Sequence, residues 1–236
     1  MNVSKLPYKY FLGVLALASA VACKKDNYSA PSSMLTGHLV YNSDTIQVER
    51  NQVPYQIYQY GFGKVAPIGG SFAQDGSYSQ VLFNGTYKII IPNGQGPFMW
   101  KQTGAGNPDT VTVDLKGNQT VNLQVTPYYM IRNANIAVSG STASATCKLE
   151  QVITDANAKN VERVSLYINK NQFASGGDNI AKADLAAADI TDMNNISLSV
   201  AVPAMTPTQN YVYARIGVKI SGLEDMIFSP LVKISF

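Results

Sequence analysis

The sequence predicts an all-β fold made of two consecutive β-sandwich domains. Apolar and polar residues alternate over short segments along most of the chain, which is the period of a strand with one buried face. Connections rich in Gly, Asn, Asp and Pro separate these segments. Residues 178–192 differ, because they are Ala-rich with apolar residues near helical spacing. We expect one short helix there, lying over a sheet edge in the second domain.

The first sandwich is expected over residues 34–127. Two of its strands form the clearest pair, residues 110–115 and 120–125, in which Val and Leu alternate with polar residues. The connection between them, residues 116–119, has the sequence KGNQ and predicts a β-hairpin. Further strands are expected at residues 35–41, 53–60 and 87–91, and on both sides of the turn at residues 74–76.

The second sandwich is expected over residues 128–236, where the alternating pattern begins again. About a hundred residues is enough for such a domain to bury its own core. Its strands are expected at residues 131–138, 142–152, 161–169, 196–202, 211–220 and 226–234.

The N-terminus has the features of a lipoprotein signal peptide over residues 1–22. Lys5 and Lys9 precede an uncharged apolar run that ends in small residues directly before Cys23. The run is too short for a transmembrane helix and is typical of a cleaved export signal. We expect Cys23 to be lipidated and residues 23–33, which are polar and contain Pro, to form a flexible tether. The alternative is an ordinary secreted protein that is cleaved nearby.

Composition argues against nucleic acid as a partner. The chain has 18 basic and 15 acidic residues, and Lys5 and Lys9 would leave with the signal. The mature chain is then nearly neutral and has no basic cluster of the kind that binds phosphate backbones. With Cys23 lipidated, Cys147 would have no disulfide partner. Its place in an alternating segment predicts a small buried side chain.

Catalytic and metal sites have little support in the sequence. His38 is the single histidine, so neither a Ser-His-Asp triad nor a histidine zinc site is expected. The carboxylates are scattered, and no pair is spaced for glycosidase chemistry. We therefore expect a protein that is not an enzyme and that uses no cofactor or metal ion.

Aromatic residues offer the candidate ligand-binding site. Tyr60 and Phe62 lie in one Gly-containing loop, and Phe98 and Trp100 lie in a long segment, residues 93–109. Long loops in compact domains are usually functional or disordered. Sugars present C–H faces that stack on aromatic rings, so these four residues are the predicted platform for a polysaccharide or oligosaccharide. Alternatively, Phe98 and Trp100 cap the open end of a sandwich or pack against the second domain.

Short motifs in each half resemble those of known sandwich families. Residues 75–78 (DGSY) and 84–89 (NGTYKI) resemble the central motif of transthyretin-like, carboxypeptidase-regulatory-like domains. Residues 205–211 resemble the approach to the tyrosine corner of fibronectin type III and immunoglobulin-like folds. That corner would turn Tyr211 inward, whereas alternation from Val212 to Ile220 would turn it outward. The conflict predicts a β-bulge near Tyr211.

Signal, first sandwich and second sandwich together resemble a domain-of-unknown-function family of Bacteroidetes outer-membrane lipoproteins. The run after Cys23, KKD, is similar to their surface-export signal. The resemblance implies an outer-membrane location, facing the cell exterior, beside the transporter and glycan-binding lipoproteins of starch-utilisation-type uptake systems. The expected function is non-enzymatic assistance in glycan or nutrient capture. The alternative is a structural docking subunit of the complex with no small ligand.

Overall fold

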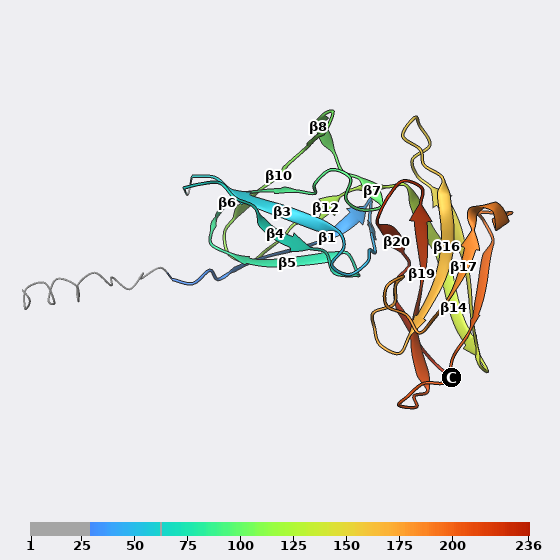
Figure 1. Cartoon of the computed structure of the whole chain (residues 1–236). Helices are drawn as coiled ribbons and strands as arrows, with labels where there is room; N and C mark the ends of the chain where they lie inside the picture. Colours follow the sequence, from blue (N-terminus) through green and yellow to red (C-terminus); the bar gives the residue numbers. More distant parts are fainter. Residues whose placement is uncertain (1–28, 62) are drawn as a thin grey trace, which may run out of the picture. The chain divides into compact units, whose positions relative to one another are not determined.

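The computed structural model describes residues 29–61 and 63–236, so the predicted signal peptide and Cys23 lie outside the described residues. Residues Ser32–Phe236 form one compact unit. Almost all of its regular structure is β-strand, which confirms the predicted all-β fold (Figure 1). Hydrogen-bonded sheets join strands β1–β13 among themselves and strands β14–β21 among themselves, and an isolated bridge between Gln47 and Phe228 links the two sets. Among the described residues, no helix has the length and apolarity of a membrane span.

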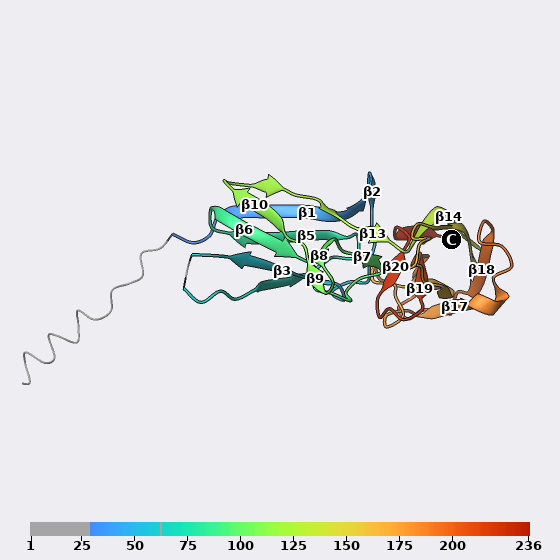
Figure 2. The same ribbon diagram turned by 90° about the horizontal axis from the view of Figure 1, so that it is seen from above.

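Strand β1 (Ser33–Tyr41) is central to one sheet of the N-terminal sandwich and runs toward β2 (Asp44–Thr45) (Figure 2). It pairs antiparallel with β5 (Ser77–Leu82) on one side. On the other side it pairs in parallel with two short strands, β11 (Gln119–Thr120) and β12 (Leu123–Gln124). The opposing sheet has the order β10 (Val111–Leu115), β6 (Gly85–Ile90), β3 (Pro54–Gln59), β4 (Ile68–Ser71).

The predicted hairpin between residues 110–115 and 120–125 is wrong. Strand β10 pairs with β6, whereas β11 and β12 pair with β1 in the other sheet. Apolar and polar residues alternate in both segments because each segment has one face on the core. Two strands that face each other from opposite sheets show this pattern, and so do the two strands of a hairpin, so the pattern alone cannot distinguish them. The connection, residues 116–118, therefore crosses from one sheet to the other.

Five strands of the second sandwich lie where the sequence predicts them, and the sixth, expected at residues 226–234, is divided into two. One sheet has the order β14 (Tyr129–Ser139), β15 (Thr142–Gln151), β18 (Ile196–Ala201). The other sheet contains β17 (Ala181–Ala186), β16 (Val161–Asn169), β19 (Tyr211–Ile220) and β20 (Met226–Phe228), with β21 (Val232–Ser235) also paired to β19.

The predicted helix at residues 178–192 is also wrong, because its centre is the edge strand β17 and only Ala187–Asp189 form a 3₁₀ turn. In β17, half-buried Ala181, Ala183 and Leu185 alternate with exposed residues. Pairing with β16 satisfies backbone groups of both strands along this edge. The requirement of the sheet overrides the helix propensity of alanine.

The expected bulge near Tyr211 is absent from β19. Residues Tyr211 to Ala214 pair regularly with β21. Val212 and Ala214 are buried, whereas Tyr211 points to the other face and packs edge-on against Tyr213, 5.8 Å between ring centroids. Alternation therefore outweighs the tyrosine-corner resemblance at this position.

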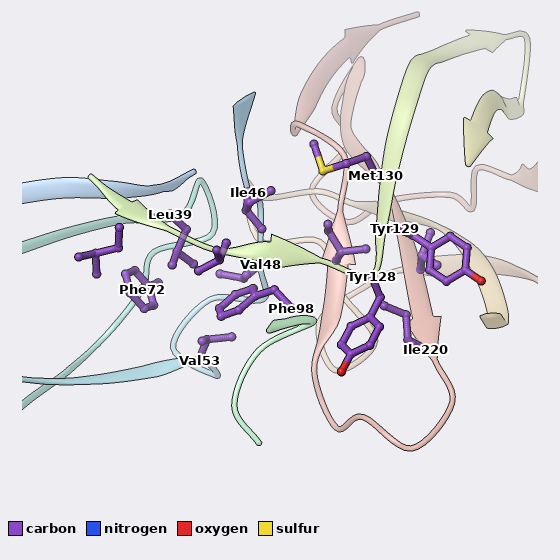
Figure 3. Close-up of a cluster of buried hydrophobic side chains, with 14 of the residues drawn as sticks. Leu39, Ile46, Val48, Val53, Phe72, Phe98, Tyr128, Tyr129, Met130 and Ile220 are labelled. Atoms are coloured by element: carbon purple, nitrogen blue, oxygen red, sulfur yellow. The ribbon is translucent and has the colours of Figure 1, made fainter. Parts of the chain in front are cut away.

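One hydrophobic core cluster includes residues of both sandwiches, and Figure 3 shows part of it. Phe98 and Tyr128 lie in this cluster, and Tyr129 and Met130 at the start of β14 continue it. Phe98 belongs to the short strand β7 (Phe98–Met99), which pairs with β13 (Thr126–Pro127) in the connection between the two sandwiches. The predicted loop at residues 93–109 thus contains β7 and a small ladder of β8 (Gln102–Gly104) with β9 (Asn107–Pro108).

Candidate functional site

The four predicted aromatic residues do not form one exposed platform. Tyr60 is 57% exposed, but Phe98 and Trp100 are only 4% and 7% exposed. Phe62 lies outside the described residues. Pairing of β7 with β13 draws Phe98 into the core, so this ring has no free face for stacking. Phe98 and Trp100 are thus too buried to form the predicted stacking platform, and their burial agrees with the alternative, in which they cap the open end of a sandwich or pack against the second domain.

Tyr60 and Trp100 also lie at different ends of the N-terminal sandwich. Tyr60 follows Gln59, which pairs with Tyr87 near the start of β6. Trp100 follows β7, whose partner β13 leads directly into the second sandwich. The two rings therefore cannot contact one ligand of modest size.

Trp100 instead forms part of the wall of an open cavity of about 710 Å³. This volume is in the usual range of small-molecule sites. Its lining comes from the end of β1, the segment around β7, the segment around β12 and β13, and the residues after β15. The apolar side chains of the lining are Tyr41, Met99, Trp100, Val125, Val152 and Ile153.

The other lining side chains are polar. They comprise three amides, two hydroxyls, one ammonium and one carboxylate, from Asn42, Gln102, Gln124, Thr126, Thr154, Lys101 and Asp155. All seven are exposed. An apolar lining that also carries amides and hydroxyls suits an uncharged, hydroxyl-rich ligand that also has apolar faces.

Hydrogen bonds hold Trp100 in place. Its indole Nε1 donates to the carbonyl oxygen of Asp109 at 2.8 Å, and Gln102 Nε2 donates to the carbonyl oxygen of Trp100 at 3.1 Å. Lys101 Nζ lies 2.9 Å from Asp109 Oδ2. The hydrogen bond from Lys101 lowers the pKa of the Asp109 carboxyl below its usual range. The carboxylate therefore stays charged and keeps Lys101 beside the cavity at neutral pH.

Backbone hydrogen bonds fix the remaining walls relative to one another. The amide of Val125 donates to the carbonyl oxygen of Val40 at 2.9 Å, which joins the β12 wall to β1. The amide of Val152 donates to the carbonyl oxygen of Tyr128 at 3.0 Å, which joins the end of β15 to the connection between the sandwiches. The cavity is thus built on sheet ends rather than on a free loop, as precise binding sites require.

Few ionisable groups line this cavity. Asp155 is the one carboxylate among the lining residues that the structure describes. His38 lies in β1 and Cys147 in β15, both outside the lining. Burial raises the pKa of the Cys147 thiol to about 11, so it is a protonated core side chain at neutral pH. Among the described residues, no cluster of His, Cys, Asp and Glu could hold a metal ion.

Sequence reasoning missed most of the cavity. Tyr41, Gln124 and Thr154 come from separate segments and share no local motif. The available signal was positional, because each segment lies at or just beyond the end of an expected strand, where binding residues often occur.

Fold and cavity together define a class: an all-β protein of two sandwiches with a preformed, amphipathic cavity of ligand size. The chain belongs to the DUF3823 family. Residues 33–126 match the model described as "Protein of unknown function (DUF3823) N-terminal domain", and residues 129–233 match "Domain of unknown function (DUF3823_C)". A search of curated proteins found no match.

Solved structures agree with this assignment. A DUF3823 family protein from Parabacteroides merdae is 33% identical, with a TM-score of 0.76 over 88% of this chain and 100% of its own. Another from Bacteroides ovatus is 26% identical, with a TM-score of 0.73 over 87% of this chain and 99% of its own. A third protein, from Bacteroides uniformis, shares the fold at 16% identity and a TM-score of 0.65, over 88% of this chain and 100% of its own. It is described as a "putative carbohydrate binding protein".

Proposed function

We propose that this chain binds a carbohydrate in the cavity beside Trp100, without catalysing a reaction on it. The carrying observation is the composition of the walls, in which apolar side chains including Tyr41 and Trp100 occur together with amides and hydroxyls. Sugar rings need both kinds of contact, because their C–H faces pack on apolar surface while their hydroxyls exchange hydrogen bonds. The description of the Bacteroides uniformis protein as carbohydrate binding is consistent with this proposal.

The proposed setting is the outer surface of a bacterium. The apolar run before Cys23 and the KKD sequence after it support lipidation at Cys23 and display on the outer membrane. There the protein would assist glycan capture beside an outer-membrane transporter and glycan-binding lipoproteins. The cavity would bind the glycan, and the transporter would carry it across the outer membrane.

Affinity electrophoresis tests the binding step. A fragment spanning residues 32–236 is suitable because these residues form one compact unit. We expect at least one polysaccharide in a panel to retard it. Gln124→Ala removes an amide from the lining and should weaken retardation about five-fold or more, the loss expected for one hydrogen bond to a ligand.

Gln119→Ala is the matched control. Gln119 and Gln124 are both exposed, and each lies in a short strand that pairs in parallel with β1. Only Gln124 lines the cavity. Retardation that falls equally in both variants would place binding elsewhere, and no retardation on any glycan would contradict the proposal.

A further inference from the structure

The exposed apolar side chains of the N-terminal sandwich gather at one end of it. Nine large hydrophobic residues are exposed among those that the structure describes, and six of them lie in this sandwich. We call these six the apolar end: Met34, Tyr60, Val65, Ile68, Val81 and Phe83. Single exposed hydrophobic residues are ordinary, but a group at one place marks an interaction surface.

Strand pairing brings the six residues together. Met34 and Val81 are direct partners in β1 and β5, and Phe83 follows β5. Ile68 pairs with Ile57 in β3, just before the loop that contains Tyr60 and Val65. Gln59, the residue before Tyr60, pairs with Tyr87, which follows Phe83 by four residues. The two groups therefore lie toward the same end of the sandwich.

The chain also enters the fold at the apolar end. Ser33, the first residue of β1, pairs with Leu82, and its Oγ donates to Asn84 Oδ1 at 2.6 Å. Cys23 precedes Ser33 by ten residues, which can span no more than roughly 35 Å even when fully extended. A lipid on Cys23 would therefore keep this end within roughly 35 Å of a bilayer.

Charge at the apolar end is positive. Its strands and turns contain three lysines, Lys64, Lys88 and Lys116. Among the described residues, the one acidic residue at this end is Asp114, which forms a 2.7 Å ion pair with Lys116. Lys88 Nζ lies 5.4 Å from the centre of the Tyr60 ring. Tyrosine and lysine beside aliphatic side chains suit the boundary between lipid headgroups and acyl chains, where phosphates attract the ammonium groups.

We propose that the apolar end is a membrane-contacting surface that docks on phosphate-bearing lipid headgroups and orients the protein. The inference rests on the proposed anchor at Cys23, because a linked anchor turns weak surface contact into an intramolecular step. With the apolar end on the bilayer, β1 points outward. At about 3.3 Å per residue, Tyr41 and the cavity then stand roughly 25 Å farther from the membrane.

A fluorescence experiment separates this contact from simple tethering. Residues 32–236 are attached through an N-terminal polyhistidine tag to vesicles of phosphatidylethanolamine, phosphatidylglycerol and a nickel-chelating lipid. An environment-sensitive dye is placed by Phe83→Cys, or by Val232→Cys in the second sandwich as a control. Both positions are exposed, while the buried thiol of Cys147 stays unlabelled. We expect emission at position 83 to rise about two-fold or more upon tethering, as for a residue entering the interface, and emission at position 232 to stay constant.

Variants that introduce a negative charge provide the second measurement. Val81→Asp should lower co-sedimentation of the untagged fragment with the same vesicles several-fold, whereas Val232→Asp should leave it unchanged. An unchanged signal at position 83, or an equal rise at both positions, overturns the proposal. Protection of position 83 by outer-membrane protein extracts but not by vesicles would show a protein partner instead and would equally overturn it.

The test is independent of carbohydrate binding and of Cys23. The polyhistidine tag replaces the lipid anchor, and glycan retardation of the same fragment is measured without vesicles. Failure of membrane contact thus leaves the cavity proposal standing, and the reverse also holds.

Discussion

The two sheets of the C-terminal sandwich differ in the solvent exposure of their outward faces. In β15, each outward residue from Ser144 to Glu150 is exposed, while Ala143, Ala145, Cys147 and Leu149 are buried. In β19 and β16 of the facing sheet, buried residues run on without alternation, as from Val164 to Asn169. The difference shows that a strand of this chain alternates only where one of its faces is left to solvent.

A second, smaller cluster covers the outward face of that sheet. Tyr167, Ala174, Met226 and Phe228 pack there, separate from the main core. Arg215 projects from β19 into this layer and is 1% exposed. Its Nε donates to the carbonyl oxygen of Ala174, its Nη1 donates to that of Val48 at 3.1 Å, and its guanidinium lies 3.7 Å from the centre of the Phe228 ring. A cation thus joins the second sandwich to a segment of the first.

Burial makes this cation costly. It lowers the pKa of Arg215 to about 10, although attraction from Glu49 partly opposes the shift. Arg215 still remains charged at neutral pH, so its hydrogen bonds and the Phe228 ring must replace the water that it lost.

The largest predicted effect is therefore that of Arg215→Ala. It leaves two buried carbonyl groups without this donor and opens a cavity, so we expect the free energy of unfolding to fall by about 3 kcal/mol or more. Urea unfolding measures this. The comparison is Arg132→Ala, whose partners Asp44 and Glu150 are about half exposed and whose loss should cost about 1 kcal/mol or less. Equal losses would show that burial of the outward face contributes little.

A middle-sized effect should distinguish the two faces of β15. Ala145→Leu adds volume to a closely packed inner face and should lower the free energy of unfolding by about 1–3 kcal/mol. Thr146→Leu, on the neighbouring exposed position, should change it by about 0.5 kcal/mol or less. Thermal unfolding of both variants measures these changes in stability. Equal changes in the two variants would contradict the prediction.

The smallest effect should be a pH dependence at Asp225. Burial raises the pKa of its carboxyl, and the amide of Gly96, which donates to Oδ2 at 2.7 Å, offsets this only in part. A raised folded-state pKa means that the folded chain holds its proton to higher pH than the unfolded chain does. The stability from this group is present below the unfolded pKa and is lost as pH rises through the folded value.

Asp225→Asn keeps an acceptor for Gly96 and removes the ionisation. Measured against wild type by urea unfolding between acid and neutral pH, the variant should become relatively more stable as pH rises. Asp109→Asn, at a carboxyl whose pKa the hydrogen bond from Lys101 lowers, should show the opposite trend. A difference between Asp225→Asn and wild type that does not vary with pH would contradict the assignment.

The sequence carried enough information for the fold and for most strands of the second sandwich. Alternation in segments such as residues 142–152 records one buried face, and this local signal survives without knowledge of the rest of the chain. Pairing carries no such signal. Residues 110–115 and 120–125 show the same period whether they face each other across a core or lie side by side, so the hairpin prediction failed. The helix prediction for the Ala-rich residues of β17 failed for another reason. Pairing with a neighbouring strand holds these helix-forming residues in an extended conformation.

The candidate site was predicted only in part. Trp100 was singled out for its chemistry, and it does line the cavity. Its exposure could not be judged, because β13, the partner of β7, lies more than twenty-five residues further along the chain. Tyr60 was correctly expected to be exposed, but the end of the sandwich to which it belongs depends on register.

Strand β1 finds its parallel partners late in the chain. The amide of Met34 donates to Asn118 Oδ1 and that of His38 to Asn122 Oδ1, contacts that span 84 residues. Closure over such separations is slow relative to local contacts. A polypeptide threaded out of a cell from its N-terminus cannot complete the first sandwich until residue 124 has emerged. Until then, β1 lacks both of its parallel partners, and one of its edges stays open.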